Sequence, residues 1–250
     1  RDLQLRLSEL HLFRGEYTAS LELIHRVCSD ELDQRSIVWG EAHFQRCRAY
    51  WVTCNYPALK DAASFLMDGG WVRRHSVIGQ TSVFLAVACQ RCGEPERVAE
   101  LMQQAEFSAL QIRNEFDLVD VRRTMAQGYL ILGDRQKAAE VARAGLATAL
   151  RHSAFYPSFT LLMIMVEVAE KSPFYLLEAG FLVELEPLLQ NRDLILYYYY
   201  SYLMSQDDGM LDNAREALER ERSYFDDDQL FQEFLSMRSF GMIASRVGMV

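Results

Sequence analysis

A short pattern recurs about every forty residues along the chain, and this repeat constrains the fold more than any other feature of the sequence. In each copy a turn residue precedes a small residue by about five positions, and an apolar segment follows. The copies read "GEYTAS", "NYPALKDAA", "GEPERVAEL", "GDRQKAAEV" and "DGMLDNAREAL", and "SPFYLLEAG" falls on the same spacing. This regular spacing predicts an array of similar units stacked on one another.

The residue composition favours helices over strands. Ala, Leu, Glu, Gln, Arg and Met fill long segments that 5 prolines and 13 glycines rarely interrupt. Turn dipeptides flanked by alternating β-branched residues, which would indicate hairpins, are scarce. We therefore expect an all-α protein.

Each unit reads as a helix, a tight turn and a second helix. Pro57, Pro95 and Pro173 fall in the first turn of second helices, where the missing N–H of proline is tolerated. The expected first helices are 2–14, 32–53, 73–91, 115–132, 157–171 and 192–206. The expected second helices are 16–28, 57–67, 95–112, 135–151, 173–189 and 210–224. A final helix near 228–246 would cover the last apolar face of the array.

Polar residues with N-cap preference precede several of these helices. Asp134 and Ser172 suit the caps of second helices, Asn114 and Asn191 those of first helices, and Asp226–Asp228 that of the final helix. Pro187 should kink or shorten the second helix that contains it.

The segment Arg122–Leu146, "RRTMAQGYLILGDRQKAAEVARAGL", resembles a tetratricopeptide (TPR) repeat. The likeness lies in the small residues Ala126 and Ala138, the aromatic Tyr129 and the Gly133-Asp134 turn. The first unit matches in part through Ser8, Gly15, Tyr17 and Ser20, and the third through Ala86 and Gly93. The spacing near forty exceeds that of the standard repeat and is similar to the longer TPR-like arrays of bacterial transcription regulators and signalling proteins. HEAT-like or armadillo-like pairing is the structural alternative.

The resemblance implies a single superhelical domain over residues 1–250. It would be a right-handed α-solenoid of about six antiparallel helix pairs with a C-terminal capping helix, and its first helices would line an inner groove. The positions that map to this groove are Gln45, Gln90, Arg91, Arg123, Gln127, Tyr198, Tyr202 and Gln206. Glutamines, arginines and tyrosines suit recognition of peptide backbone and carboxylates, although the same residues could simply be solvated.

The stretch "LYYYYSYLM" belongs to the first helix of the sixth unit in this frame. Five tyrosines in six positions cannot all face one side of a helix. We expect Tyr200 and Met204 to pack inward, and Tyr198 and Tyr202 to share the face turned toward the groove.

Signatures of catalysis and metal binding are weak. "CQRC" at Cys89–Cys92 is a lone CxxC, and no phosphate loop or nucleophile elbow occurs. "QDDGMLD" nearly matches an aspartate-rich magnesium motif of helical terpene cyclases, but Asp212 falls one position late. The histidines are scattered without ligand spacing: His11, His25, His43, His75 and His152. We therefore expect no enzyme activity, cofactor or metal, and keep a helical metal-dependent enzyme as a remote alternative.

A net charge of −9 and a pI near 5.1 argue against direct nucleic-acid binding and against an anionic-membrane surface. No apolar run reaches the length of a membrane span. Five cysteines within apolar segments suit free thiols in a reducing compartment, which favours a cytoplasmic location. The arginine-rich composition fits a GC-rich coding source.

The combined pattern predicts a non-enzymatic module that binds a protein or peptide within a larger signalling or transcription-regulatory protein, from which the chain, beginning at Arg1, would be a piece. An alternative is a receptor domain that closes around a small-molecule inducer and controls an attached output domain. Self-association through the aromatic-rich sixth unit or the final helix is a further possibility.

Overall fold

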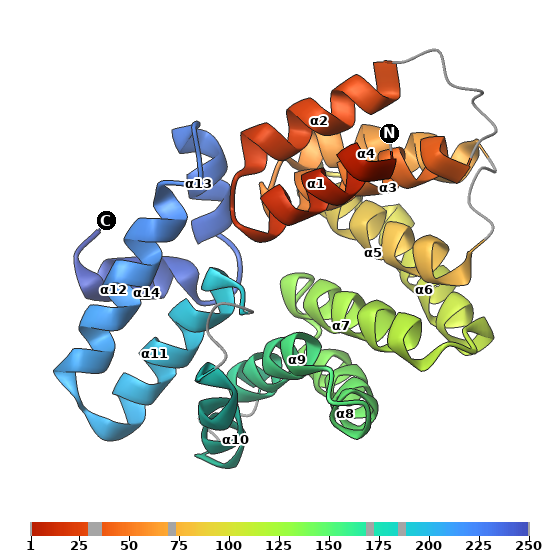
Figure 1. Cartoon of the computed structure of the whole chain (residues 1–250). Helices are drawn as coiled ribbons and strands as arrows, with labels where there is room; N and C mark the ends of the chain where they lie inside the picture. The colour runs from red at the N-terminus through yellow and green to blue at the C-terminus, as the bar shows by residue number, and fades with distance from the viewer. Residues whose placement is uncertain (1, 30–36, 70–73, 169–172, 185–188, 250) are drawn as a thin grey trace. The chain divides into compact units, whose positions relative to one another are not determined.

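The computed structural model describes residues 2–29, 37–69, 74–168, 173–184 and 189–249. Every regular element within these residues is a helix, as expected from the composition (Figure 1). The chain divides into two compact units, Arg1–Ile112 and Arg113–Val250, which are described separately below. The expectation of one superhelical domain over 1–250, with its handedness and number of pairs, stays a prediction.

The first unit, Arg1–Ile112, is a succession of helical hairpins. Its helices are α1 (Asp2–Phe13), α2 (Tyr17–Ser29), α3 (Ile37–Val52), α4 (Tyr56–Asp68), α5 (His75–Arg91), the short 3₁₀ helix η1 (Pro95–Arg97) and α6 (Val98–Gln111). The pairs α1–α2, α3–α4 and α5–α6 pack together, and α2 and α4 also pack on the helix that follows them. In addition α1 contacts α3 and α3 contacts α5, so the first helices of the hairpins form a row (Figure 1).

The second unit, Arg113–Val250, continues the same pattern and adds two short helices. Its helices are α7 (Glu115–Ile131), α8 (Arg135–Arg151), α9 (Phe155–Val168), α10 (Pro173–Val183), α11 (Asn191–Ser205), α12 (Asp208–Arg222), α13 (Asp228–Leu235) and α14 (Phe240–Val247). The pairs α7–α8, α9–α10 and α11–α12 pack together, while α7, α9 and α11 again contact one another in a row. α7, α8, α9, α11 and α12 agree with the sequence expectation to within a few residues at each described end, whereas α10 ends at Val183, six residues before the expected end.

The turn between the paired helices is the same backbone motif in successive hairpins. Gly15, Cys54, Gly93 and Gly133 all have positive φ, and they lie about forty positions apart. In each turn the N–H of the residue after the positive-φ residue donates to the carbonyl five positions earlier, at 2.8–3.0 Å. The four donor and acceptor pairs are Glu16 with His11, Asn55 with Tyr50, Glu94 with Cys89, and Asp134 with Tyr129. This is the bond that closes a helix end in a Schellman motif, and glycine adopts the left-handed conformation without a Cβ clash. The repeat seen in the sequence is therefore a repeat of one helix-terminating turn.

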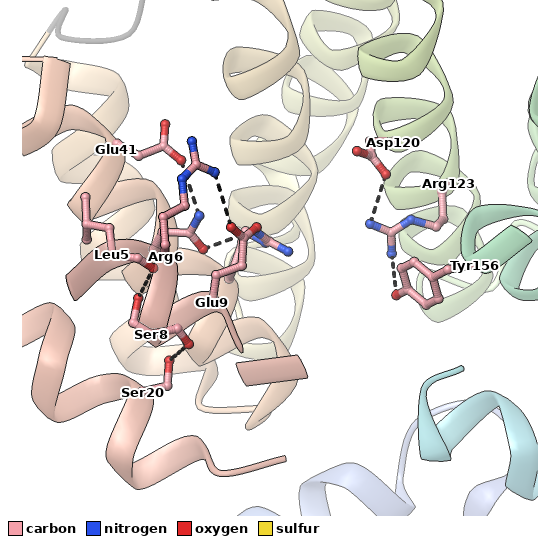
Figure 2. Close-up of polar contacts among 11 residues, drawn as sticks. Leu5, Arg6, Ser8, Glu9, Ser20, Glu41, Asp120, Arg123 and Tyr156 are labelled. Atoms are coloured by element: carbon pink, nitrogen blue, oxygen red, sulfur yellow. Dashed lines mark hydrogen bonds and ion pairs between the residues drawn. The ribbon is translucent and has the colours of Figure 1, made fainter. Parts of the chain in front are cut away.

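Small residues let the paired helices approach closely, as the sequence pattern predicted. Ser8, Ser20, Ala86, Ala126 and Ala138 have no exposed surface. Ser20 Oγ on α2 donates to the Ser8 carbonyl on α1 at 2.8 Å, and Ser8 Oγ donates to the Leu5 carbonyl at 2.7 Å (Figure 2). The two serines thus fill the contact between helices while keeping their hydroxyls hydrogen bonded.

The expected final helix near 228–246 is wrong as a single element, because the chain breaks it between α13 and α14. Arg238 lies in the break with a positive φ of 49°. Ser236, Ser239 and Gly241 in this stretch are weak helix formers, so little propensity opposes the break. The predicted cap at the start of this region is confirmed, since the Asp227 carboxylate accepts from the Gln229 N–H at 2.7 Å.

Other sequence expectations have mixed outcomes. Asn114 and Asp134 cap α7 and α8 as predicted. Asn191 does not cap α11, because its side chain instead donates across to the Ala217 carbonyl on α12 at 2.7 Å.

Met204 is 42% exposed and so does not pack inward, whereas Tyr200 is buried as expected. The expected cap at Ser172 and kink at Pro187 lie outside the described residues.

We predict that Gly145→Val destabilises the second unit. A Cβ at Gly145 on α8 would lie 3.2 Å from the Arg122 Cβ on α7 and 3.2 Å from a Leu161 methyl carbon on α9. Overpacking of this kind costs about 1–3 kcal/mol of unfolding free energy. Chemical denaturation followed by circular dichroism measures the loss, and Ala147→Val on the exposed face of α8 is the matched control. Equal stability of the two variants would show that α8 is not held this close to its neighbours.

His43 is a buried neutral histidine in the first unit. Its ring on α3 packs between Trp39 and Phe65, with ring centroids 4.1 and 4.9 Å away. Burial, helped by the nearby Arg46 charge, lowers the pKa of His43 from 6.5 to about 4. Between pH 6.5 and about 4 this side chain therefore stays neutral in the folded chain, whereas it binds a proton in the unfolded chain.

We predict that His43 makes the protein less stable as the pH falls from 6.5 toward 4. In this interval the unfolded state binds more protons than the folded state, so unfolding becomes more favourable by up to roughly 2 kcal/mol at pH 4.5. His43→Leu should remove this part of the pH dependence. Urea unfolding at pH 7 and pH 4.5 measures it, with His75→Gln at an exposed position as the control. The same acid sensitivity in His43→Leu and in the unaltered chain would contradict the prediction.

Candidate functional site

The residues predicted to line a groove all lie on first helices or just beyond one, but their exposure differs. Gln90, Arg91 and Gln206 are exposed, Arg123, Gln127 and Tyr198 are half-buried, and Gln45 and Tyr202 are buried. Gln206 has positive φ at the end of α11, and its side chain donates to the Leu203 carbonyl at 3.1 Å. Arg91 lies over the Tyr56 ring at 5.6 Å. Their role as partner contacts stays a prediction.

Gln45 belongs to a polar cluster that joins α1 to α3 in the first unit, and Figure 2 labels its members Glu9 and Glu41. Its amide donates to Glu41 at 3.2 Å, and its carbonyl accepts from Arg48 Nη1 at 3.1 Å. The same Arg48 nitrogen donates to Glu9 on α1 at 2.7 Å. Because Gln45 is only 4% exposed, its main task is to orient Arg48 toward Glu9.

Arg123 spans two first helices in the second unit. Its guanidinium donates to the Tyr156 hydroxyl on α9 at 3.2 Å, faces that ring at 5.1 Å, and reaches Asp120 on its own helix at 3.5 Å (Figure 2). Burial alone would lower the pKa of Arg123, but Tyr156, Asp120 and Asp193 outweigh it and hold the pKa above the usual arginine range. Arg123 is thus a fixed positive charge at the contact between α7 and α9.

The strongest concentration of buried charge in the second unit is a site built by α9, α11 and the link before α14. Arg238 Nε donates to the Glu167 carboxylate on α9 at 2.5 Å, and a second guanidinium nitrogen pairs with the same oxygen. The third nitrogen lies 3.6 Å from the Asp193 carboxylate on α11. The three side chains are between 3% and 6% exposed. We call this arrangement of Glu167, Asp193 and Arg238 the arginine site.

Hydrogen bonds from neighbouring residues fix the two carboxylates of the arginine site. Thr160 Oγ1 donates to Asp193 at 2.6 Å, and Ser239 Oγ donates to Glu167 at 3.0 Å. Arg135 Nη2 donates to the Glu167 main-chain carbonyl at 2.5 Å. Oriented, buried carboxylates of this kind recognise the planar fork of a guanidinium better than they recognise a lysine ammonium.

The chain following Arg238 contacts α11 through side chains, whereas α14 itself packs on α12 and α13. The Ser239 hydroxyl lies 3.0 Å from the Tyr200 hydroxyl of α11, and burial, followed by the Glu167 charge, raises the pKa of Tyr200. Arg246 Nη2 donates to the Tyr202 hydroxyl at 3.2 Å. We call residues Met237–Val247 the Arg238 segment. Tyr202, which was predicted to face a groove, is 7% exposed and contacts this segment.

Sequence reasoning missed the arginine site. One signal was available, because Glu167 is the only charged residue of α9, in the otherwise apolar run "FTLLMIMVEVA". A charge in such a run must be paired when it is buried. Its partner Arg238 lies 71 residues away in the chain, and no periodic pattern identifies it.

The cysteines and carboxylates elsewhere in the chain lie in the following environments. Burial raises the pKa of the Cys47 thiol to about 12 and also raises the pKa of Cys89, which disfavours reactive thiolates. Among the described residues, no group of three or more His, Cys, Asp or Glu side chains is placed to hold a metal ion. In the aspartate-rich stretch, Asp207 caps α12 and Asp212 pairs with Arg215 at 2.8 Å.

Comparisons with known proteins leave the family open. No family model matches the sequence, and a search of curated proteins finds no relative. No helix among the described residues has both the length and the apolar character needed to cross a membrane.

We predict that Glu167→Ala strongly destabilises the second unit. The substitution leaves the buried Arg238 guanidinium without its main partner, which costs about 3–5 kcal/mol of unfolding free energy. Asp212→Ala, which removes one partner of the exposed pair with Arg215, is the matched control and should cost less than about 1 kcal/mol. Denaturant unfolding of both variants measures the difference. A loss for Glu167→Ala no larger than for the control would mean that Arg238 is not buried against α9.

Proposed function

We propose that this chain is a TPR-like helical-repeat module that binds a protein or peptide and has no catalytic activity of its own. It would serve as a docking or sensing part of a cytoplasmic signalling or transcription-regulatory protein. The binding surface would be the face of the first helices in the second unit, α7, α9 and α11.

The observation that carries this proposal is the set of contacts that Arg238 and Ser239, at the start of the Arg238 segment, make with α9 and α11. A short stretch of polypeptide lies there and is held through its side chains by Glu167, Asp193, Tyr200 and Tyr202. A face that binds one peptide segment in this way has the chemistry to bind another. Repeat proteins use such continuous rows of helices to bind extended partners.

The two carboxylates that pair with Arg238 favour a cationic occupant in its place. Glu167 and Asp193 supply two buried carboxylates, and the chain as a whole carries −9. Complementary charge increases the rate of encounter and suppresses partners of the wrong sign.

We predict that a random peptide library selected on the purified chain yields binders that depend on Glu167. Glu167→Gln keeps the shape of the side chain and removes its charge, so affinity should fall at least about tenfold, or about 1.4 kcal/mol. Glu140→Gln, at an exposed position on α8, is the matched control and should change affinity less than about twofold. Fluorescence anisotropy gives both values.

Two results would contradict the proposal. One is that selection enriches no peptide above a denatured-chain control. The other is that every selected peptide binds Glu167→Gln and Glu140→Gln equally well, which would move binding away from this face.

A further inference from the structure

We propose that the arginine site recognises a peptide that carries an arginine followed by a small hydroxyl residue and an aromatic residue, and that the Arg238 segment is the chain's own occupant of that site. This inference rests on the proposed function, because it names the class of peptide that the face of α9 and α11 would bind. The motif is read directly from Arg238-Ser239-Phe240.

Each of the three residues of the motif has a defined contact. Arg238 binds Glu167 and Asp193, and Ser239 bonds both Glu167 and the Tyr200 hydroxyl. Phe240 is 1% exposed and stacks on Phe234, with ring centroids 4.4 Å apart. Recognition therefore combines a guanidinium fork, a hydroxyl and an aromatic anchor, which are the elements of many short-peptide sites.

The site requires a cation whichever segment fills it. The two carboxylates face one guanidinium directly, and the other charges near them belong to Arg123, Arg135 and Asp120. If a neutral segment covered the site in place of the Arg238 segment, two carboxylates held by hydrogen bonds would be buried with too little positive charge. An incoming arginine restores the pairing, whereas a neutral or acidic peptide does not.

The Arg238 segment depends on contacts with neighbouring elements for its structure. Its only regular element, α14, has eight residues, and a helix of this length is not stable alone. Its apolar side is buried through Ile243, Ala244 and Val247, and Arg215 on α12 donates to the Val247 carbonyl at 3.1 Å. The segment is joined to α13 by the break at Ser236–Ser239, where Arg238 has positive φ. Its structure thus depends on contacts that a peptide in trans can replace.

The test uses the full chain and a fluorescent peptide of residues 236–247, SMRSFGMIASRV. The variant Arg238→Gln vacates the arginine site, and its melting curve by circular dichroism shows whether it is folded. We expect the peptide to bind this variant at least about tenfold more tightly than the unaltered chain, because the competing internal arginine is gone.

Two altered peptides separate the arginine site from general attraction to an acidic protein. Arg238→Gln in the peptide should weaken binding to the variant chain by at least about tenfold, whereas Met242→Glu, which changes the net charge by the same amount at an exposed position, should weaken it less than about threefold. Equal weakening by the two substitutions would overturn the proposal, since it would reflect net charge alone.

A measurement on the unaltered chain keeps the proposal testable if Arg238→Gln does not fold. Excess peptide should speed hydrogen exchange of the Ile243–Val247 amides at least about tenfold and leave the α9 amides unchanged. Unchanged exchange in α14 at saturating peptide would overturn the proposal. If exchange in α14 is unchanged but library-selected peptides still bind in a Glu167-dependent way, the proposed function stands and only the arginine-motif proposal fails. If the selected peptides do not depend on Glu167 either, the proposed function and the arginine-motif proposal both fail.

Discussion

Close approach of paired helices through one recurring turn is the constraint on which the rest of this structure depends. In the first four hairpins the left-handed residue and the bond five positions back stop the first helix at a fixed point, so the second helix starts in the same relation each time. Small residues such as Ser8, Ser20, Ala126 and Ala138 then allow the two backbones to come together. A larger side chain at these positions would push the hairpin open and shift every helix packed against it.

This geometry explains why the informative side chains lie on first helices. Because first helices contact the first helix of the next hairpin, a residue on one helix reaches a partner on another, as Arg123 reaches Tyr156 and Arg48 reaches Glu9. In the second unit the same row carries Glu167 and Asp193. Burying two carboxylates is costly, and a folded chain retains them only with a guanidinium and hydroxyl donors in place. The pairing of Glu167, Asp193 and Arg238 therefore holds the link before α14 against α9 and α11.

The sequence predicted most helices because their signals are local. Apolar spacing, proline in the first turn and a glycine at the helix end act within a few residues of each other. It failed where a local signal competed with a tertiary contact, as at Asn191, whose amide donates to the Ala217 carbonyl of α12 instead of capping α11. It also failed at the C-terminal break, where the contact of Arg238 with Glu167 outweighs the continuous helical pattern. The tyrosine cluster was predicted in part: Tyr200 is buried, but Tyr202 lies beneath Arg246 and Met204 is exposed.

By itself the sequence determined an all-helical chain with a helix-terminating turn about every forty residues, because turn residues and helix propensity depend only on near neighbours in the chain. Only the tertiary structure decided which polar residues meet. Glu167, Asp193 and Arg238 come from three separate elements, and their pairing follows from the angle at which α9, α11 and the break before α14 pack together. A long-range contact of this kind produces no periodic pattern in the sequence. A buried charge needs a partner that is close in space, and that partner can lie at any distance along the chain.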